Sequence, residues 1–379
     1  MISLPGRGQL LSIMLMTALP LQVTAWEFGG DIRSGLYASE RLDRQGERQR
    51  ADDWRARIRL SADRDLAGDW RFRIRAAGRY SSDDNTGDAY FRAWAPTRSG
   101  IATGDTTIDT LQWQWQPEHG EWGVLIGRFQ AQAGIPVVPG KGLDRKDSSN
   151  VGVSWTDGIE LSHPLPGRWQ GRSRLFYNHQ RGAGGVYRFP LDHQDSGSRL
   201  ALSSAFESTA GPGPLILRRV TITWMPDSLA PDGPQSPRRE DYRSLTGSLA
   251  TSWPVAPSGT RLVVAGELGF TDARVPTGLL DAGDEGTLGG RAWQASANLF
   301  DLAPGHLLGL VYGEAEGSWL HSVDYRNNDA LAEIRYQYRF TPALSFEGRY
   351  RWRRELKVPD DSPRRRVDQD IYLRLSARF

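Results

Sequence analysis

Residues 54–80 read WRARIRLSADRDLAGDWRFRIRAAGRY. In the first half, apolar or small residues hold the even positions from Trp54 to Ala62, and arginines hold positions 55, 57 and 59. The second half, 70–80, repeats this alternation with arginines at positions 71, 73, 75 and 79. Successive side chains of a strand point to opposite faces. The stretch therefore predicts two strands, each with one apolar and one charged face, joined by a tight turn at 65–69.

The same unit recurs to the end of the chain. Short Pro/Gly-rich connections fall near 65–69, 117–120, 164–168, 209–214, 254–259, 301–305 and 341–343, and longer polar ones near 39–51, 82–104, 132–150, 180–197, 226–240, 272–288, 316–327 and 355–366. These connections join sixteen strands of about 10 residues, an even number as in bacterial outer-membrane barrels. We therefore predict an all-β fold, a closed 16-stranded antiparallel transmembrane β-barrel with short periplasmic turns and long external loops. Residues 89–95 could form a further strand, but counting it alone would invert the later turns, so it is placed in the second external loop.

Composition narrows the class of protein. The 379 residues include no cysteine, and no apolar run reaches the roughly 18 residues of a membrane-spanning helix, which excludes a helical membrane protein. The chain has 47 Lys+Arg against 45 Asp+Glu, and only three of the basic residues are lysines. A nearly neutral balance is atypical of nucleic-acid-binding domains, so we expect no nucleic acid partner. The arginine bias instead indicates planar forks that suit carboxylates and phosphates.

The first 25 residues are expected to be a signal peptide. Arg7 precedes an apolar stretch at 10–21, and the small-residue spacing that ends at Ala25 predicts cleavage before Trp26. Residues 26–379 are then predicted to be a single transmembrane β-barrel. Export without cysteine indicates a Gram-negative envelope, where the sheet and not disulfides holds the fold.

Aromatic residues near the predicted strand ends indicate two interfacial girdles. Those beside short turns are Trp70, Trp122, Trp169, Trp253 and Phe340, and those toward long loops are Tyr80, Tyr177, Trp224, Phe270 and Trp352. The last strand ends on Phe379. This ending resembles the assembly signal of outer-membrane barrels and implies the barrel-assembly machinery as a partner.

Sixteen strands, an export leader and a C-terminal phenylalanine together resemble the Gram-negative porins. Within that group, the 54–80 pair, Asp88-Ala89-Tyr90 and Gly127-Arg128-Phe129 are similar to the phosphate-selective type. The resemblance implies an outer-membrane channel for small hydrophilic solutes, a homotrimer, and a loop after the fifth strand that folds into the lumen as a constriction. Here that loop is 132–150, and its charged residues are Lys141, Asp144, Arg145, Lys146 and Asp147. Its excess of cations departs from the acidic constriction loop of general porins.

If apolar residues face lipid, the alternate set faces a water-filled lumen. The expected anion path consists of Arg33, Arg55, Arg57, Arg59, Arg71, Arg73, Arg75, Arg79, Arg349, Arg351, Arg353 and Arg374, with Arg335, Arg339 and Arg378 on the same face. Because the last strand closes on the first, these residues form one basic sector across the seam. We expect the sector to face the constriction loop and conduct anions of the phosphate kind, since arginine rings suit anion pores. The acids on this face, Asp31, Glu333, Glu347 and Asp370, are expected to pair with neighbouring arginines. A simpler interpretation is that the arginines only solvate the wall and join strands.

Three other functions stay open. A sugar or oligosaccharide channel would need a track of inward tryptophans, for which Trp94, Trp113, Trp155 and Trp319 are the candidates. A hydrolase barrel has only the adjacent pairs Ser162-His163 and His321-Ser322 as hints, and the histidines show no paired metal-ligand spacing, so we expect no enzyme, no metal and no cofactor. In a structural barrel, loops such as 238–241 and 364–366 could bind lipopolysaccharide phosphate, and outer-membrane lipid is an expected partner in every case.

Overall fold

The computed structural model describes residues 25–82, 96–97, 100–101, 106–117, 122–147, 153–178, 188–193, 198–209, 213–257 and 259–379. Sixteen of the described strands form one closed barrel, and β4 (Pro96–Thr97) and β5 (Gly100–Ile101) pair as a separate small sheet. The predicted leader up to residue 24 and the possible strand at 89–95 lie outside the described residues. None of the helices in the described ranges is long and apolar enough to cross a membrane.

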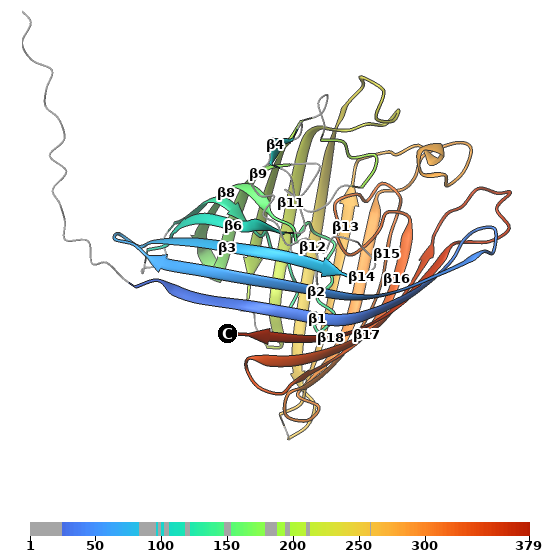
Figure 1. Ribbon diagram of the computed structural model, residues 1–379. Coiled ribbons are helices and arrows are strands. Elements are labelled where there is room, and N and C mark those ends of the chain that lie inside the picture. Colours follow the sequence, from blue (N-terminus) through green and yellow to red (C-terminus); the bar gives the residue numbers. More distant parts are fainter. Residues whose placement is uncertain are drawn as a thin grey trace, which may run out of the picture.

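Neighbouring barrel strands follow the order of the chain, every pair is antiparallel, and the last strand closes against the first (Figure 1). This confirms the predicted 16-stranded barrel. The barrel strands are β1 (Glu27–Leu42), β2 (Arg48–Asp65), β3 (Trp70–Ser81), β6 (Thr106–Trp115), β7 (Gly123–Phe129), β8 (Thr156–Leu165), β9 (Trp169–Tyr177), β10 (Leu200–Ser208), β11 (Leu215–Leu229), β12 (Glu240–Pro254), β13 (Arg261–Thr271), β14 (Arg291–Phe300), β15 (His306–Ala315), β16 (Asp329–Arg339), β17 (Leu344–Glu355) and β18 (Val367–Arg378).

Short connections gather at the end of the barrel where β1 begins and β18 ends, and long ones at the other end (Figure 1). One short connection contains the 3-10 turn η1 (Pro166–Arg168), and one long connection contains η2 (Thr277–Leu280). The first long connection is shorter than the predicted 39–51, because β1 and β2 stay paired up to Leu42 and Arg48. The alternation of apolar and polar residues stops near residue 39, because polar residues then occupy both faces. The two strands nevertheless remain hydrogen-bonded to each other beyond that point. Gly46 makes the turn possible with a φ of 94°.

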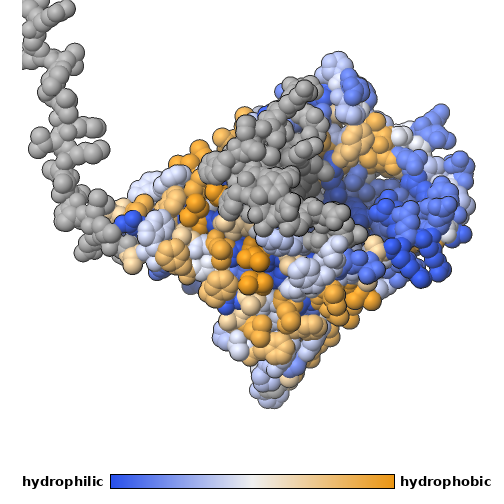
Figure 2. Space-filling model, in the orientation of Figure 1, coloured by the Kyte–Doolittle hydropathy of each residue, from blue (hydrophilic) through white to orange (hydrophobic). Residues whose placement is uncertain are grey.

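The outer surface of the barrel is apolar along its middle (Figure 2). Outward side chains such as Leu36, Leu268 and Leu310 are 60%, 59% and 51% exposed, which suits contact with lipid and not with water. Exposed aromatic residues flank this zone, including Trp122 and Phe340 beside short turns and Trp224 and Phe270 toward long loops. The predicted girdles therefore lie on the outer surface.

Loops from the long-loop end fold into the barrel and pack around an apolar core, which we call the plug. Its larger cluster joins the end of β7 and Ala131, just before the constriction loop, to three other loops and to strands β9–β12; its members are Phe129, Ala131, Phe176, Leu191, Ala201, Met225, Leu229, Tyr242, Ala273, Val275 and Leu320. A second cluster packs Leu143 of the constriction loop against Trp319 and Tyr325, with residues of β14–β16. The apolar clusters of the plug thus lie on the β7–β16 side, and among the described residues their members include no residue of β17, β18, β1, β2 or β3.

Candidate functional site

The inward faces of β16, β17, β18, β1, β2 and β3 form one continuous wall, which we call the seam sector. The register places every predicted path arginine on this wall, because none of the five strand pairings involved contains a register shift. The alternate residues of the same strands, such as Ile58 and Ile371, are exposed on the outer surface. Many of the arginines are enclosed: Arg57 is 0% exposed, Arg59 4% and Arg353 7%.

The seam sector contains two rows of arginines, and within each row the arginines of neighbouring strands are paired directly in register. Arg57 of β2 is paired in register with Arg33 of β1 on one side and with Arg79 of β3 on the other. Arg335 of β16 is likewise paired with Arg349 of β17. Like charges in direct cross-strand positions destabilise a sheet. Stability of the sheet alone does not account for these rows.

Carboxylates lie one step away from the rows and neutralise part of their charge. Asp31 accepts a hydrogen bond from Nη2 of Arg57 at 2.9 Å and lies 3.5 Å from Nε of Arg33. Asp109 receives Arg59 at 3.1 Å and Arg75 at 2.7 Å. The predicted pairing of Asp31 with neighbouring arginines is confirmed.

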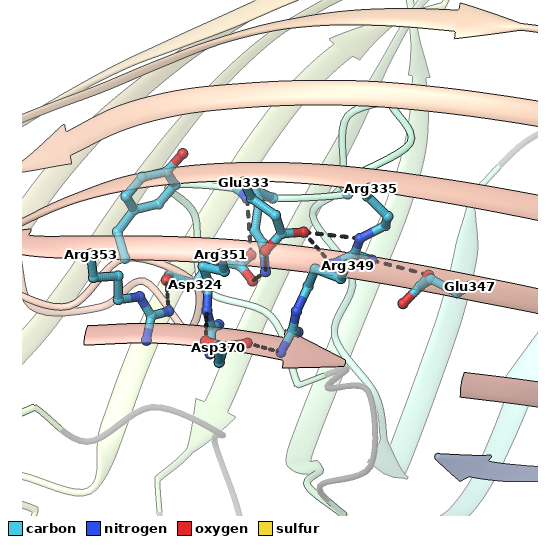
Figure 3. A network of polar contacts seen from close by, with 12 residues as sticks. Asp324, Glu333, Arg335, Glu347, Arg349, Arg351, Arg353 and Asp370 are labelled. Atoms are coloured by element: carbon cyan, nitrogen blue, oxygen red, sulfur yellow. Dashed lines mark hydrogen bonds and ion pairs between the residues drawn. The ribbon is translucent and has the colours of Figure 1, made fainter. Parts of the chain in front are cut away.

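Figure 3 shows the corresponding network on β16–β18. Glu347 joins Arg335, at 3.3 Å, to Arg374, at 3.0 Å. Asp370 accepts from Nε of Arg351 at 2.6 Å and also binds Arg349. Glu333 binds Arg335 on the same strand. Glu347 and Asp370 each space two guanidinium groups, and Glu333 binds Arg335 and Lys141, so all three acids pair with neighbouring cations as the sequence indicated.

Asp109 was missed by the sequence analysis because a β-bulge hides it. The register of β3 and β6 shifts between Arg75 and Ala76, so strict alternation fails at this point of β6. The bulge brings Asp109 to the inside, where it is 0% exposed. Asp109 is the only charged residue in the sequence of β6, but the alternation did not show which face of the strand it occupies.

Two tyrosines stand among the arginines. The rings of Tyr37 and Tyr372 meet edge to face with centroids 6.4 Å apart. The guanidinium carbon of Arg55 lies 4.0 Å from the centroid of Tyr37, and that of Arg349 lies 5.1 Å from the centroid of Tyr372. Cation–π contacts of this kind keep the guanidinium planes fixed against the wall.

The constriction loop enters the lumen as predicted, and its charged side chains are tied to loop 316–328 and to the wall. Nζ of Lys141 lies 3.2 Å from Asp324 and 3.3 Å from Glu333, and Nζ of Lys146 lies 2.7 Å from Asp324. Burial lowers the pKa of Lys141 to about 8, although the two carboxylates oppose this change. Burial alone would raise the pKa of Asp324, but Lys146 and Lys141 hold it well below its usual range.

The other charged residues of the loop are also held. Asp144 accepts from the hydroxyl of Thr221 at 3.0 Å, Arg145 binds Asn178 over the ring of Phe176, and Asp147 binds Thr156. Three side chains of the barrel wall also hydrogen-bond to the loop backbone. Glu267 and Asn298 accept from the backbone nitrogens of Leu143 and Val138, and Gln294 donates to the backbone oxygen of Lys141. None of these anchors was singled out in the sequence, where each is one more inward polar residue.

Between the loop and strands β9–β11 lies a small polar cavity of about 20 Å³. Its lining includes Arg172, Arg174 and Arg219, together with Glu207 and hydroxyl groups of β10 and β11. Arg172 and Arg174 share Glu160 at 3.4 and 2.5 Å, and Arg219 lies 3.4 Å from Glu207. Like most arginines of the seam sector, each of these three lies within ion-pair distance of an acid.

The structure places the candidates for other chemistries as follows. Trp113 points outward and is 44% exposed, whereas Trp155 and Trp319 are 1% and 0% exposed inside loops, and Trp94 lies outside the described residues. None of the described candidates offers a free stacking face to the lumen. Ser162 and His163 point to opposite faces of β8.

The second hydrolase hint is also divided. Ser322 donates to the backbone oxygen of Gly142 at 2.8 Å, while Nδ1 of His321 lies 3.3 Å from the hydroxyl of Tyr242. Burial lowers the pKa of His321 to about 4. Within the described ranges, no group of three or more His, Cys, Asp or Glu residues is arranged to hold a metal ion.

No family model matches the chain, and no curated protein sequence matches it. Its fold is similar to solved structures. The high-pH structure of Pseudomonas putida OprB is 11% identical, with 93% of this chain and 94% of that chain covered at a TM-score of 0.59. Pseudomonas aeruginosa OccK8 (OprE) is 12% identical over 93% and 98%, with a TM-score of 0.54. P. aeruginosa OccK2 (OpdF), solved in complex with glucuronate, is 14% identical over 93% and 96%, with a TM-score of 0.51. At these identities, the likeness shows that the chain shares the closed 16-stranded barrel of these structures.

Proposed function

We propose that the protein is a porin-like channel in the outer membrane of a Gram-negative bacterium, and that small anions of the phosphate kind cross it along the seam sector. The observation that carries the proposal is the row Arg33, Arg57 and Arg79, three like charges in direct register on adjacent strands. A sheet gains no stability from such a row. A lumen lined by closely spaced guanidinium groups, in contrast, attracts and partly dehydrates anions.

The position of the plug supports the same proposal. Apolar packing fills the β7–β16 side, so a solute that enters the lumen meets the seam sector. The constriction loop adds few free charges, because Lys141 and Lys146 are paired with carboxylates. The selectivity filter is therefore the strand wall, and the loop narrows the route.

The test is the reversal potential of the refolded barrel in a planar bilayer under a salt gradient. Replacing all three row arginines by glutamine should lower anion entry roughly tenfold, since a unit charge about 8 Å away in water is worth ~0.5 kcal/mol and acts three times. Cation entry rises by a similar factor, so the anion-to-cation permeability ratio should fall by up to roughly 100-fold. Arg243→Gln, on an outward side chain that is 61% exposed, is the matched control. An anionic reversal potential with phosphate block supports the proposal. An unchanged ratio in the triple variant contradicts it.

A sugar-type channel is the second candidate, and the mixed polar lining of the wall at β9–β11 favours it. Paired Arg174 and Glu160 beside the hydroxyls of Thr221 and Thr223 offer both donors and acceptors, as a neutral polyhydroxylated solute requires. Current block by glucose, glucuronate and phosphate separates the candidates. Equal block by glucose and glucuronate favours the sugar route, and block by the two anions alone favours the arginine route.

The proposal includes the assembly expected from the sequence: a leader removed after Ala25, recognition of Phe379 by the barrel-assembly machinery, and a homotrimer. Phe379 is in position to serve as a signal, because its ring is 66% exposed and its backbone pairs with Gly30. The protein is proposed to act without a cofactor and without catalysis. Cross-linking in native membranes would test the trimer.

A further inference from the structure

The outward faces of β17, β18, β1 and β2 form a regular pattern near the long-loop end. In register, one row reads Arg354, Val367, Leu42 and Arg48 across the four strands, and the next reads Trp352, Gln369, Glu40 and Arg50. The row below reads Tyr350, Ile371, Ala38 and Asp52, and the next one is apolar, with Leu373, Leu36 and Trp54. Charged residues therefore give way to apolar surface over about two rows. Aromatic residues at this boundary mark the membrane interface.

Arginines on neighbouring loops extend the charged rows. Arg364 and Arg365 of the 356–366 loop are exposed, and the guanidinium group of Arg364 lies beside Gly46 at the tip of the β1–β2 hairpin. The hairpin is fixed to the same region because Arg44 binds Glu355 at 3.0 Å. Figure 2 shows strongly hydrophilic residues gathered at the right, where Figure 1 places this hairpin and the 356–366 loop. We call Arg48, Arg50, Arg354, Arg364 and Arg365 the outer basic rim.

Most of the positive charge of the rim is not neutralised by the protein. Glu40 lies 2.7 Å from Arg50 and 4.0 Å from Arg48, and these two arginines are still 72% and 64% exposed. In the described part of the chain, no carboxylate lies within ion-pair distance of Arg354, whose Nε is buried without an acceptor. This contrasts with Arg366, which faces inward to Asp329, Glu355 and Asp368.

A shallow recess lies directly below the rim. It has a volume of about 320 Å³ and opens to the outside, and its lining includes Ala38, Glu40, Arg50, Asp52, Tyr350 and Ile371. Small or flat residues at its centre, between Tyr350 and Trp54, leave room for an acyl chain against Ile371 and Leu36, which are 51% and 60% exposed. An amphiphile placed there would have its chains on the apolar rows and its head at the arginines.

We infer that this surface binds a phosphorylated glycolipid of the outer leaflet, with the phosphates held by the outer basic rim and the acyl chains on the recess. Charge selects the occupant: guanidinium groups at both ends of one row, about 14 Å apart across three strand spacings, complement an anionic head with separated phosphates. The inference rests on the outer-membrane location proposed above and is independent of ion selectivity.

The test compares binding of defined lipids to the delipidated, refolded barrel by native mass spectrometry. The probes are lipid A with two phosphates, the same lipid with its phosphates removed, and phosphatidylglycerol. The variant Arg48→Gln/Arg50→Gln/Arg354→Gln should bind bisphosphorylated lipid A more weakly by on the order of tenfold or more, with a weaker salt dependence. The matched control, Arg243→Gln/Arg291→Gln, removes two exposed outward arginines at the same end but on β12 and β14, and should bind as the wild type does.

Four results would overturn the inference: unchanged binding in the triple variant, an equal loss in the control, equal binding of the dephosphorylated lipid, or displacement by inorganic phosphate at the concentration expected for a free-phosphate site. The reversal potential is measured on the same samples. It should be unchanged in the triple variant, so failure of the lipid site and failure of the proposed anion selectivity are distinguishable.

Discussion

Asp324→Asn should release the constriction loop without altering the strand wall. Asp324 binds Lys141 at 3.2 Å, Lys146 at 2.7 Å and the backbone nitrogen of Gly142 at 3.0 Å, and its side chain is 12% exposed. The amide keeps an oxygen for Gly142 but removes the charge that both lysines face. Removing one partner of a buried pair costs about 3–5 kcal/mol. We expect the low end of this range, because Lys141 keeps Glu333 at 3.3 Å.

A loss of about 3 kcal/mol raises the population of the released loop roughly 150-fold. Digestion with trypsin measures the population of the released loop, because trypsin cleaves after Lys141, Arg145 and Lys146. In the native packing these sites are protected: Lys141 is 4% exposed and Arg145 7%. Cleavage in the loop should accelerate by about that factor, and single-channel current should show frequent closures. Asp361→Asn, on an exposed loop, is the control. Wild-type protection in Asp324→Asn would refute the argument that charge at this position holds the loop.

Three further predictions concern the plug and the seam. Burial lowers the pKa of His193 and His321 to about 4, below the unfolded value of 6.5, so the plug is most stable above pH 6.5. It should lose up to about 3 kcal/mol per histidine as the pH falls to 4, measured as faster hydrogen–deuterium exchange of the plug backbone after correction for the pH dependence of free amides, with no change above pH 7. Leu320 is 0% exposed in the larger plug cluster, so Leu320→Ala should cost about 2–5 kcal/mol of loop stability. The single-channel current should become noisier. A current record like that of the wild type would show that the cluster does not hold the loops. A Cβ at Gly30 would lie 2.7 Å from the Phe379 ring, so Gly30→Leu should slow barrel closure, measured as the rate at which the heat-modifiable band forms on a gel; wild-type closure would contradict this.

The sequence predicted the strands well because lipid imposes alternation on one face. Each inward arginine of 54–80 was placed correctly by parity, and the strand count located the constriction loop. The alternation failed as a guide in two places. At Asp109 a β-bulge breaks it, and in the β1–β2 hairpin near Leu42 the outward side chains are no longer required to be apolar. Register across the barrel was also beyond the sequence, so the direct opposition of Arg33 and Arg57 could not be read from it.

The anchors of the loop could not be predicted for a different reason. Asp324 and Glu267 contact the loop across 182 and 124 positions of sequence, and nothing local marks them. Glu267 is an inward acid of β13, like the inward acids of the seam sector, and only the fold shows that it binds a backbone nitrogen of the loop as well as Arg219. Long-range partners of an in-folded loop are chosen by shape, which a one-dimensional pattern does not contain.

The two walls of the lumen therefore have different roles: the β11–β16 wall holds the constriction loop, and the seam sector sets the charge that a solute meets. On β11–β16, polar side chains such as Gln294 and Asn298 are occupied by the loop, so their loss should change gating. On the seam, the repulsion within the Arg33, Arg57 and Arg79 row costs about 0.2–1 kcal/mol per pair and is offset by acids such as Asp31, so its removal should change selectivity with little loss of stability. Since the walls share no anchor at the row, the effects of Asp324→Asn and of the row variant should add when combined. Strong coupling between them would mean that the loop itself, and not the strand wall, sets the field that a solute meets.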